Sequence, residues 1–334
     1  MRRIGLIISG VIVAVAIAAA TAWASLALWY RLPTGSVTKG LAAGVFVVVG
    51  LSTLVSLFGR LRLLALAFFI APFGAILLWW NGILPERTAD WAPDVARQVT
   101  GRLDGEILTL TNIRDFEWHT NADFSERWSS RSYDLAKLRT LDLFLSYWAG
   151  PEMAHTILSF GFDGGEFLAF SIEVRRRKGG EFSPIADLFK SNPLVIIAAD
   201  ERDVIRVRSN VRHEDVQLYR LRVSPERIRP LLLEYVADSN ALADAPRFYN
   251  SITTNCTTTI VEMMRVVGDA LPLDWRLIVN GYLPDYAYAR GALDMRLPLS
   301  ELKALAHIDR RAAEADSLSN FSELIRVGVP NSRE

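Results

Sequence analysis

The stretch that decides the fold of this chain is residues 155–174, HTILSFGFDGGEFLAFSIEV. Two runs in which apolar and polar residues alternate, 155–162 and 167–174, flank Asp163-Gly164-Gly165. Alternation of this kind is typical of half-buried strands, and the two glycines supply the positive φ that a tight turn needs. We therefore predict a β-hairpin over this stretch.

The loop length sets which side chains of the hairpin face one another. A three-residue loop pairs Leu158 with Phe170 and keeps the apolar side chains on one face, whereas a two-residue loop would mix the faces. Because a one-residue slip costs the whole buried face, we expect the three-residue register. His155 then lies directly opposite Glu173, with Cβ atoms about 4.5–5.5 Å apart. The alternatives are a polar-face histidine without a role and a carboxylate paired with the arginines at 175–177.

Cys256 is the only cysteine of the chain and lies in residues 253–260, TTNCTTTI, directly before a helix-periodic apolar segment. A thiol in the first turn of a helix is at the positive end of the helix dipole, which favours the thiolate. Thr254 or Asn255 could cap this helix, and amide donors around Cys256 could form an oxyanion hole. The alternative is a cysteine that is only a small buried core residue.

Three uncharged segments lie within the first 85 residues, in a chain of 334 residues that is 51% hydrophobic. They are Ile4–Tyr30, Gly40–Phe58 and Leu63–Leu84. Each meets the roughly 18–20 residues that a helix needs to cross a bilayer core. A cleaved signal peptide is the alternative for the first segment, but its apolar run is longer than usual and two further spans follow.

Basic residues set the expected orientation of these spans. With the N-terminus in the cytoplasm, three spans place everything after Leu84 outside it, in a multi-pass protein of the bacterial inner membrane with a periplasmic domain. A single cysteine suits the periplasm because it cannot form an intramolecular disulfide. Four basic residues then lie inside and two outside: Arg2, Arg3, Arg60 and Arg62 against Arg31 and Lys39.

We predict an α+β fold in which three N-terminal transmembrane helices precede a permuted papain-like domain with an antiparallel sheet and a cysteine-bearing helix. The expected parts are a membrane anchor (1–85), a juxtamembrane linker with a short helix (86–104), a periplasmic catalytic domain (105–290), and a C-terminal helix and tail (291–334). Strands are expected at 105–118, 138–148, 194–199, 204–209 and 216–223 besides the hairpin, helices at 225–238 and 300–315, and irregular structure at 124–135.

Thiol chemistry needs a thiolate, a group that shuttles protons, and a group that orients it. We expect Cys256 to act as nucleophile, His155 as base, and Glu173 to orient His155. A strand-borne histidine with a helix-borne cysteine is the geometry of papain-like sites, here in permuted order. We expect no metal and no cofactor, because the histidines lack metal-ligand spacing and no phosphate loop or G-x-S-x-G elbow occurs.

Four short pieces of sequence resemble a known family: RSYDL (131–135), AHT (154–156), FSIEVR (170–175), and YN (249–250) followed by NCT (255–257). They are similar to the periplasmic domain of the Lnb lipoprotein N-acyltransferases, over about residues 105–290. The resemblance implies a nucleophile at Cys256 and a base at His155. The other residues of these pieces that we expect to bind substrate or form the oxyanion hole are Asn255, Thr257, Tyr249, Asn250, Tyr133, Ser171 and Arg175.

The reaction that the resemblance implies is acyl transfer from a glycerolipid ester to the α-amine of a lipoprotein's N-terminal cysteine, through an enzyme thioester. Membrane lipid and a lipoprotein N-terminus are therefore the expected partners. Net charge is zero, which does not suggest nucleic acid, and the sequence assigns no oligomeric state. The family carries its membrane helices largely after the catalytic domain, whereas here they come before it, so the substrate need not be shared. The alternatives are a cysteine amidase or peptidase acting on cell-wall peptide, and a non-catalytic membrane module.

Overall fold

The computed structural model describes residues 2–268 and 271–331, with side chains from Ile8 onward except at the undescribed positions. The chain forms two compact units. The smaller unit is Met1–Pro85 with Ser183–Ser191, and the larger unit is Glu86–Phe182 with Asn192–Glu334.

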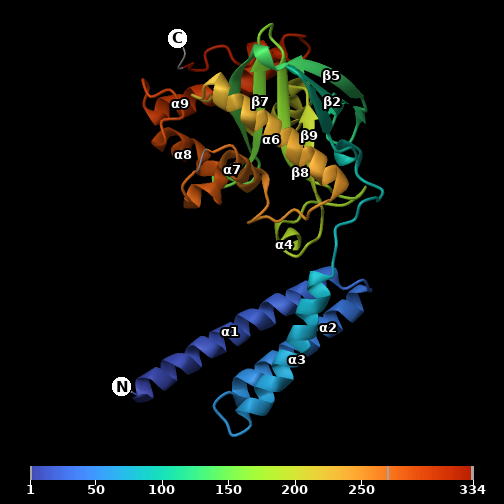
Figure 1. The fold of residues 1–334 in the computed structure, drawn as a ribbon, viewed down its shortest axis with the longest axis vertical. Helices are drawn as coiled ribbons and strands as arrows, with labels where there is room; N and C mark the ends of the chain where they lie inside the picture. The colour runs from blue at the N-terminus through green and yellow to red at the C-terminus, as the bar shows by residue number, and fades with distance from the viewer. Residues whose placement is uncertain (1, 269–270, 332–334) are drawn as a thin grey trace. The chain divides into compact units, whose positions relative to one another are not determined.

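Three long helices make up most of the smaller unit: α1 (Arg2–Arg31), α2 (Ser36–Ser56) and α3 (Arg62–Asn81) (Figure 1). All three are long and apolar enough to cross a membrane. Most of their large apolar side chains point outward, which suits a lipid solvent. The expected three apolar helices are therefore present.

A short segment from far along the chain completes the smaller unit. Residues 183–191, with α4 (Pro184–Asp187), pack on the ends of α1 and α3. The Phe189 ring stacks on Tyr30 at 5.4 Å and meets Trp80 edge-on at 6.3 Å. Lys190 Nζ donates to the Trp80 carbonyl at 2.8 Å. Sequence patterning did not indicate this insertion.

The larger unit is built on one sheet of the order β1-β2-β9-β8-β7-β6-β10, with β5 paired to β2. All pairs are antiparallel except β2 with β9, so the sheet is mixed where we expected an antiparallel one. The α+β class is confirmed. The strands are β1 (Thr100–Asp104), β2 (Ile107–Arg114), β5 (Trp128–Asp134), β6 (Leu138–Tyr147), β7 (Ala154–Phe162), β8 (Phe167–Val174), β9 (Leu194–Ala199) and β10 (Asp215–Arg220), and β3 (Glu117–Trp118) pairs with β4 (Phe124–Ser125) in a separate ribbon.

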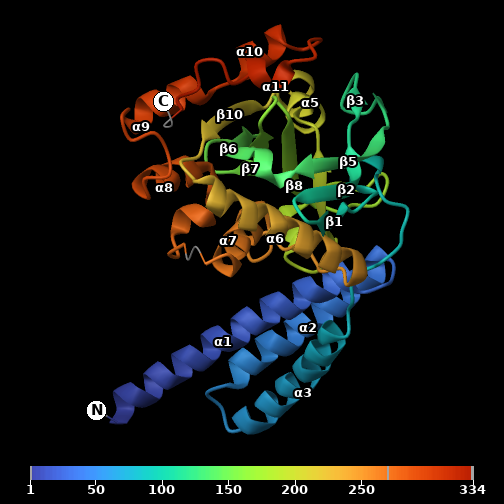
Figure 2. The same ribbon diagram turned by 45° about the horizontal axis from the view of Figure 1, so that its top comes forward.

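Helices cover both faces of this sheet (Figure 2). Residues of β9 alternate between two core clusters, with Leu194, Ile196 and Ala198 in one and their neighbours in the other. The first cluster includes α6 (Pro225–Asp244) and Cys256 at the start of α7 (Cys256–Val266). The second includes α10 (Asp309–Glu314) and α11 (Phe321–Leu324). A strand that is buried on both faces has a continuous run of apolar residues, and residues 194–199 form such a run.

The hairpin register is confirmed. Leu158 pairs with Phe170 and Phe160 with Leu168, as the three-residue loop requires. Gly164 and Gly165 have φ of 94° and 82°, a region that other residues rarely adopt. The first residues of β7 and the last residues of β8 therefore lie together at one end of the sheet.

The predicted strand at 204–209 is wrong. This segment is helical, with α5 (Glu201–Val204) followed by the π-helix η3 (Val207–Val211). Its apolar residues Val204, Ile205 and Val207 are all buried, and that spacing fits one face of a helix better than one face of a strand.

Besides the short β4, two strands lie where we expected none. The segment 124–135 contains β5, and the presumed linker 86–104 contains η1 (Pro93–Val95) and β1. Both strands pair only with β2, so each is an edge strand with mostly polar, partly exposed side chains. Edge strands lack the apolar alternation that reveals buried strands.

The C-terminal part also departs from the expected helices. The helix expected at 300–315 is two helices, α9 (Leu299–Ala306) and α10, because His307 is extended and forms a β-bridge with Gln217. The helix that begins at Pro225 continues to Asp244, beyond the expected end at 238. Short helical turns fill the aromatic region that follows α7: η4 (Trp275–Leu277), η5 (Asn280–Tyr282) and α8 (Leu283–Ala289).

Packing of the hairpin against α6 predicts a large cost for truncating Phe160, which is fully buried against Phe170 and Tyr235. We expect Phe160→Ala to lower the free energy of unfolding by about 3–5 kcal/mol, because it removes a buried ring and leaves a cavity. Urea unfolding of the detergent-solubilised full chain, followed by near-UV circular dichroism, measures this. Leu318→Ala, at an exposed position, is the matched control, and equal midpoints for the two variants would contradict the packing described.

Candidate active site

Cys256 is the first residue of α7, and Asn255 is its N-cap. Asn255 Oδ1 accepts hydrogen bonds from the backbone N–H groups of Thr257 and Thr258, each at 2.9 Å. Thr258 Oγ1 accepts in turn from the Asn255 backbone N–H at 2.9 Å, which completes a capping box. Of the two residues expected to cap the helix, Thr254 and Asn255, it is therefore Asn255 that does so. The box fixes the first turn of the helix and with it the Cys256 side chain, which is buried.

His155 is the second residue of β7 and meets Cys256 across the end of the sheet. The imidazole and the thiol are close enough that each shifts the pKa of the other, and the Thr156 backbone also acts on the pKa of the thiol. Thr156 Oγ1 lies 3.0 Å from Thr257 Oγ1, which holds the start of α7 against the start of β7. The structure thus brings together two residues that sequence reasoning could only assume to meet.

Glu173 contacts the imidazole of His155 in two ways, directly and through the hydroxyl of Ser171. His155 Nε2 is 2.7 Å from Ser171 Oγ and 3.2 Å from Glu173 Oε1. Ser171 Oγ donates to Glu173 Oε1 at 2.7 Å. Because Nε2 faces these two groups, Nδ1 is the nitrogen left for the thiol. Ser171, expected to bind substrate, instead links the imidazole to the carboxylate.

Arg208 is a member of this group that sequence reasoning missed. Its Nη2 donates to Glu173 Oε1 at 2.9 Å, and its side chain is 7% exposed. Arg208 comes from η3, the segment wrongly predicted as a strand, so its side chain was assigned to no particular face. Periodicity that recognised a helical segment would have placed Arg208 on the same face as the buried Val204.

The charges of these groups explain the titration of the site. Burial alone would raise the pKa of the Cys256 thiol, but the hydrogen bond and charge of His155 outweigh it and hold that pKa below its ordinary value. Burial alone would lower the pKa of His155, but the Glu173 carboxylate raises it to about 9. Burial opposes ionisation of Glu173 as well, yet His155 and Arg208 hold its pKa well below the usual range. The arrangement therefore stabilises the ionised forms of all three groups relative to their neutral forms.

Asn280 is a second residue that the sequence did not reveal. Its Nδ2 donates to the Ala154 carbonyl at 2.6 Å and to Thr257 Oγ1 at 3.0 Å, and lies 3.7 Å from Cys256 Sγ. Its Oδ1 accepts from the Ala154 N–H at 3.0 Å. Asn280 therefore fastens η5 to both elements that carry the thiol and the imidazole. The Asn-Gly pair at 280–281, a turn signal, was the available clue.

Some predicted binding residues shape the approach to Cys256. Asn250 Oδ1 accepts from the backbone N–H groups of Ile252 and Thr253 at 3.0 Å each, which forms the turn before the N-cap. Tyr249 is buried beside that turn. The hydroxyl of Thr257 is engaged by the neighbouring strand and by Asn280, as described above.

Two other predicted residues have contacts elsewhere in the domain. Tyr133 on β5 is buried and stacks on Phe162 at 5.2 Å. Arg175 Nη2 donates to the Ala96 carbonyl at 2.6 Å, and its guanidinium lies over the Trp91 ring at 4.8 Å. Their similarity to the family motif is thus explained in this structure by contacts that hold the fold together.

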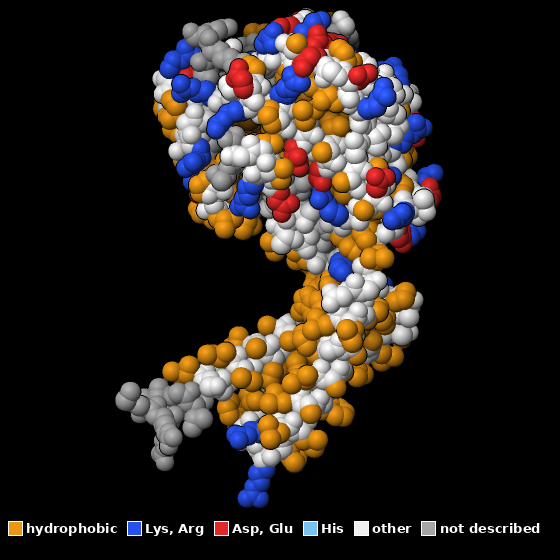
Figure 3. Space-filling view, in the orientation of Figure 1, with side chains coloured by type: hydrophobic (Ala, Val, Ile, Leu, Met, Phe, Trp, Pro, Cys, Tyr) orange, Lys and Arg blue, Asp and Glu red, His pale blue; other side chains and the backbone are white. Residues whose placement is uncertain are grey.

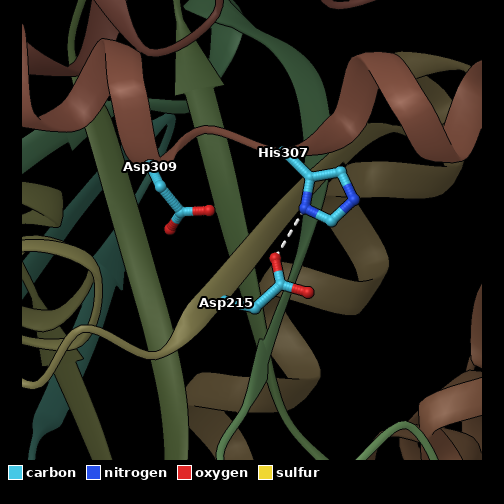
Figure 4. A group of neighbouring side chains, drawn as sticks. All are labelled: Asp215, His307 and Asp309. Carbon is cyan, nitrogen blue, oxygen red and sulfur yellow. Dashed lines mark hydrogen bonds and ion pairs between the residues drawn. The ribbon is translucent and has the colours of Figure 1, made fainter.

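A cavity of about 950 Å³ lies at a different place in the domain, and Cys256, His155 and Glu173 do not line it. Asp215, His307 and Asp309 are among the residues that line it, and they offer ligand atoms within 4.8 Å of one another, of the kinds that bind divalent ions (Figure 4). Spacing did not reveal this group, because Asp215 and His307 come from distant segments. Their side chains pair at 2.6 Å, and Asp309 accepts from the Val216 N–H, so contacts within the protein account for the group.

Comparison with known protein families gives a match over part of the chain. Residues 124–281 match the family model described as the Lnb N-terminal periplasmic domain. The matched range contains Cys256, His155 and Glu173 and ends just after Asn280. No curated protein and no solved structure shows significant similarity to the chain. The resemblance to the Lnb family is confirmed over these residues, and together with three helices long and apolar enough to cross a membrane it indicates a membrane protein with a periplasmic domain.

Contact between Cys256 and His155 predicts a thiol that reacts readily at neutral pH. Because the thiolate is the reactive form and the pKa of Cys256 is lowered, the wild-type protein should be alkylated by iodoacetamide faster at pH 7 than a thiol of ordinary pKa. In His155→Gln the thiol loses its cationic partner and its pKa rises, so we expect the rate at pH 7 to fall by roughly tenfold or more and to recover as the pH rises. Intact mass spectrometry follows the reaction at the sole cysteine.

His307→Gln is the control for this experiment, because His307 pairs with Asp215 and has no bond to the thiol. Its profile should match that of the wild type. A His155→Gln profile that is unchanged would show that the imidazole does not activate Cys256.

Proposed function

Because residues 124–281 match the Lnb N-terminal periplasmic domain, we propose that this protein is a membrane-anchored thiol acyltransferase that acts on membrane-lipid esters through Cys256. The observation that carries the proposal is the continuous chain of contacts from Cys256 to His155, Glu173 and Arg208. A buried thiol that is only a core residue needs no imidazole held by a carboxylate. The domain match is our reason for proposing acyl transfer among the reactions that such a thiol supports.

In the first step the Cys256 thiolate attacks the ester carbonyl of a glycerolipid. The C–S bond forms and the negative charge moves to the carbonyl oxygen. The tetrahedral intermediate then collapses as the glyceryl oxygen leaves, and the His155 imidazolium gives it a proton. The products are an acyl thioester on Cys256, a lysolipid alcohol and a neutral imidazole.

In the second step a primary amine attacks the thioester, with the α-amine of a lipoprotein's N-terminal cysteine as the proposed acceptor. Neutral His155 takes a proton from the attacking amine, and the thiolate leaves. The amide product carries the acyl chain, and the imidazolium–thiolate pair is restored. Glu173, ionised and held by Arg208, stabilises the imidazolium in the resting and final states.

Backbone amides supply the proposed oxyanion site. The capping box uses the N–H groups of Thr257 and Thr258, so the Cys256 N–H, next to the sulfur at the start of α7, is the donor that we assign. Asn255 acts by holding this turn in place, and its own amide donates to the Ser251 carbonyl at 2.9 Å.

The membrane arrangement is part of the proposal. Three spans with the N-terminus in the cytoplasm make a multi-pass protein of the inner membrane and put the catalytic domain in the periplasm, in agreement with the distribution of basic residues. The acyl donor is then a component of the same membrane.

Trapping of the acyl-enzyme tests this function. Purified full-length protein incubated with phospholipid should gain the mass of one acyl chain at Cys256, and neutral hydroxylamine should remove it because thioesters are labile to this nucleophile. Cys256→Ala should gain nothing. Adding a peptide with a diacylated N-terminal cysteine should discharge the thioester and yield an N-acylated peptide.

Other outcomes would overturn the proposal. Cleavage of cell-wall peptide by the wild type, without acyl capture from lipid, would assign the same residues to a cysteine amidase or peptidase. Full activity of Cys256→Ala in cells would leave a membrane module in which the cysteine is only structural.

A further inference from the structure

Exposed apolar side chains lie on several segments that adjoin the Cys256 end of α7. Six of them, here called the rim, have exposures between 41% and 59%: Trp148, Met153, Phe182, Ile252, Trp275 and Ile278. In Figure 3 hydrophobic side chains gather over the lower left of the larger unit, where Figure 1 places α7. Contiguous exposed apolar surface on a folded domain is typical of a binding surface.

One half of the rim is joined by ring contacts. Trp148 meets Phe182 edge-on, with centroids 5.9 Å apart, and Phe182 meets Tyr249 at 6.5 Å. Tyr249 is followed by the turn that presents Ile252 and ends at the N-cap of α7. This half therefore runs from the β6 end to the residue before the thiol.

The other half of the rim is connected to Cys256 and to Met153 through Asn280 and Gly281. Its amide lies 3.7 Å from Cys256 Sγ, and it follows Ile278 by two residues. Gly281 N–H donates to the Glu152 carbonyl at 3.0 Å, which places η5 beside Met153. A Cβ at position 281 would lie 2.0 Å from the Pro151 carbonyl oxygen, so glycine is required for this close approach. Both halves thus meet at the loop between β6 and β7.

The charges on the η4 side of the rim are paired. Asp274 and Arg276, which flank Trp275, form an ion pair at 2.7 Å. On this side the rim therefore offers mainly apolar and aromatic groups to a partner. Tryptophan is enriched where a protein meets the interface of a bilayer.

The covalent connection between the rim and the membrane helices favours lipid as the partner that covers the rim. Phe182 directly precedes Ser183–Ser191, the segment that packs on Tyr30 and Trp80 at the ends of the apolar helices. A rim residue is therefore covalently continuous with a segment bound to the end of the membrane spans. Because the spans anchor the domain, lipid is permanently present at high local concentration, whereas a soluble partner would leave the rim in water between encounters.

We propose that the rim is a lipid-contact surface that enters the interfacial region of the bilayer around the opening to Cys256. The contact with lipid does not require Cys256 to be catalytic. The consequence of this contact for catalysis rests on the proposed function. If Cys256 is the nucleophile, the ester of a membrane lipid reaches the thiolate without its acyl chain passing through water.

Depth-dependent quenching of single labels tests the proposal. The chain has one cysteine, so Cys256→Ser gives a background in which Ile278→Cys or Ile252→Cys carries the only thiol. The full-length protein is labelled with nitrobenzoxadiazole and reconstituted into phosphatidylglycerol and phosphatidylethanolamine nanodiscs, with or without nitroxide-bearing lipid. Leu318→Cys, 45% exposed and between α10 and α11, is the control.

We expect nitroxide lipid to quench both rim labels at least twofold more strongly than the label at Leu318. Equal quenching at all three positions would overturn the proposal. So would rim labels that are shielded from water but not quenched, since a protein surface would then cover the rim. Near-UV circular dichroism confirms that each variant is folded, and because Cys256 is absent throughout, the outcome is independent of the acyl-enzyme experiment.

Discussion

The register of β7 between β6 and β8 is the constraint on which the rest of the site depends. Neighbouring residues of a strand point to opposite faces, so His155 and Thr156 have separate tasks. Thr156 fastens the start of α7 through Thr257, and His155 reaches Glu173 and the thiol. A slip of one residue would exchange the positions of the His155 and Thr156 side chains, and the imidazole would be separated from its carboxylate. The same slip would expose the apolar face of the hairpin. Fold and chemistry are therefore fixed by the same pairing.

Charge alternation makes it feasible to bury this site. With the thiol ionised, the groups from the sulfur outward are thiolate, imidazolium, carboxylate and guanidinium, contributed by Cys256, His155, Glu173 and Arg208. Each charge has a neighbour of opposite sign, and the sum over the four is zero. An isolated buried charge costs far more than a paired one, so each member depends on the next. Arg208 ends the row, and its position on a π-helix fits the observation that such bulges are frequent at functional sites.

Sequence patterning predicted those parts of the fold in which local chemistry and burial agree. The three apolar helices, the hairpin register and the capped start of α7 depend on run length, on two glycines and on Asn255, and all are readable from neighbouring residues. Edge strands β1 and β5 were missed because only one side of each is paired and their side chains are largely polar. The segment around Val204 was misassigned because six residues are too few to separate the helical from the strand period.

The candidate site divides in the same way. Cys256, His155 and Glu173 could be singled out because a lone thiol, a helix start and a hairpin partner are local signals. Arg208 and Asn280 could not, because their roles come from contacts between segments that are distant in sequence. For Tyr133 and Arg175 a motif was visible, but similarity to a motif does not separate a group that binds substrate from one that holds the fold.

The inserted segment Ser183–Ser191 changes how the molecule can be divided. Anchor and domain are connected at three points of the chain rather than one: after Pro85, after Phe182 and after Ser191. A protease that cuts between Pro85 and Thr100 would break one connection, yet the domain would remain attached through Phe189 and Lys190 to the helices. A truncation that removes residues 1–85 would carry the segment along without its aromatic partners. The soluble part of this protein therefore has no clean boundary in the sequence, and work on the isolated domain has to account for the apolar surface that such a cut uncovers.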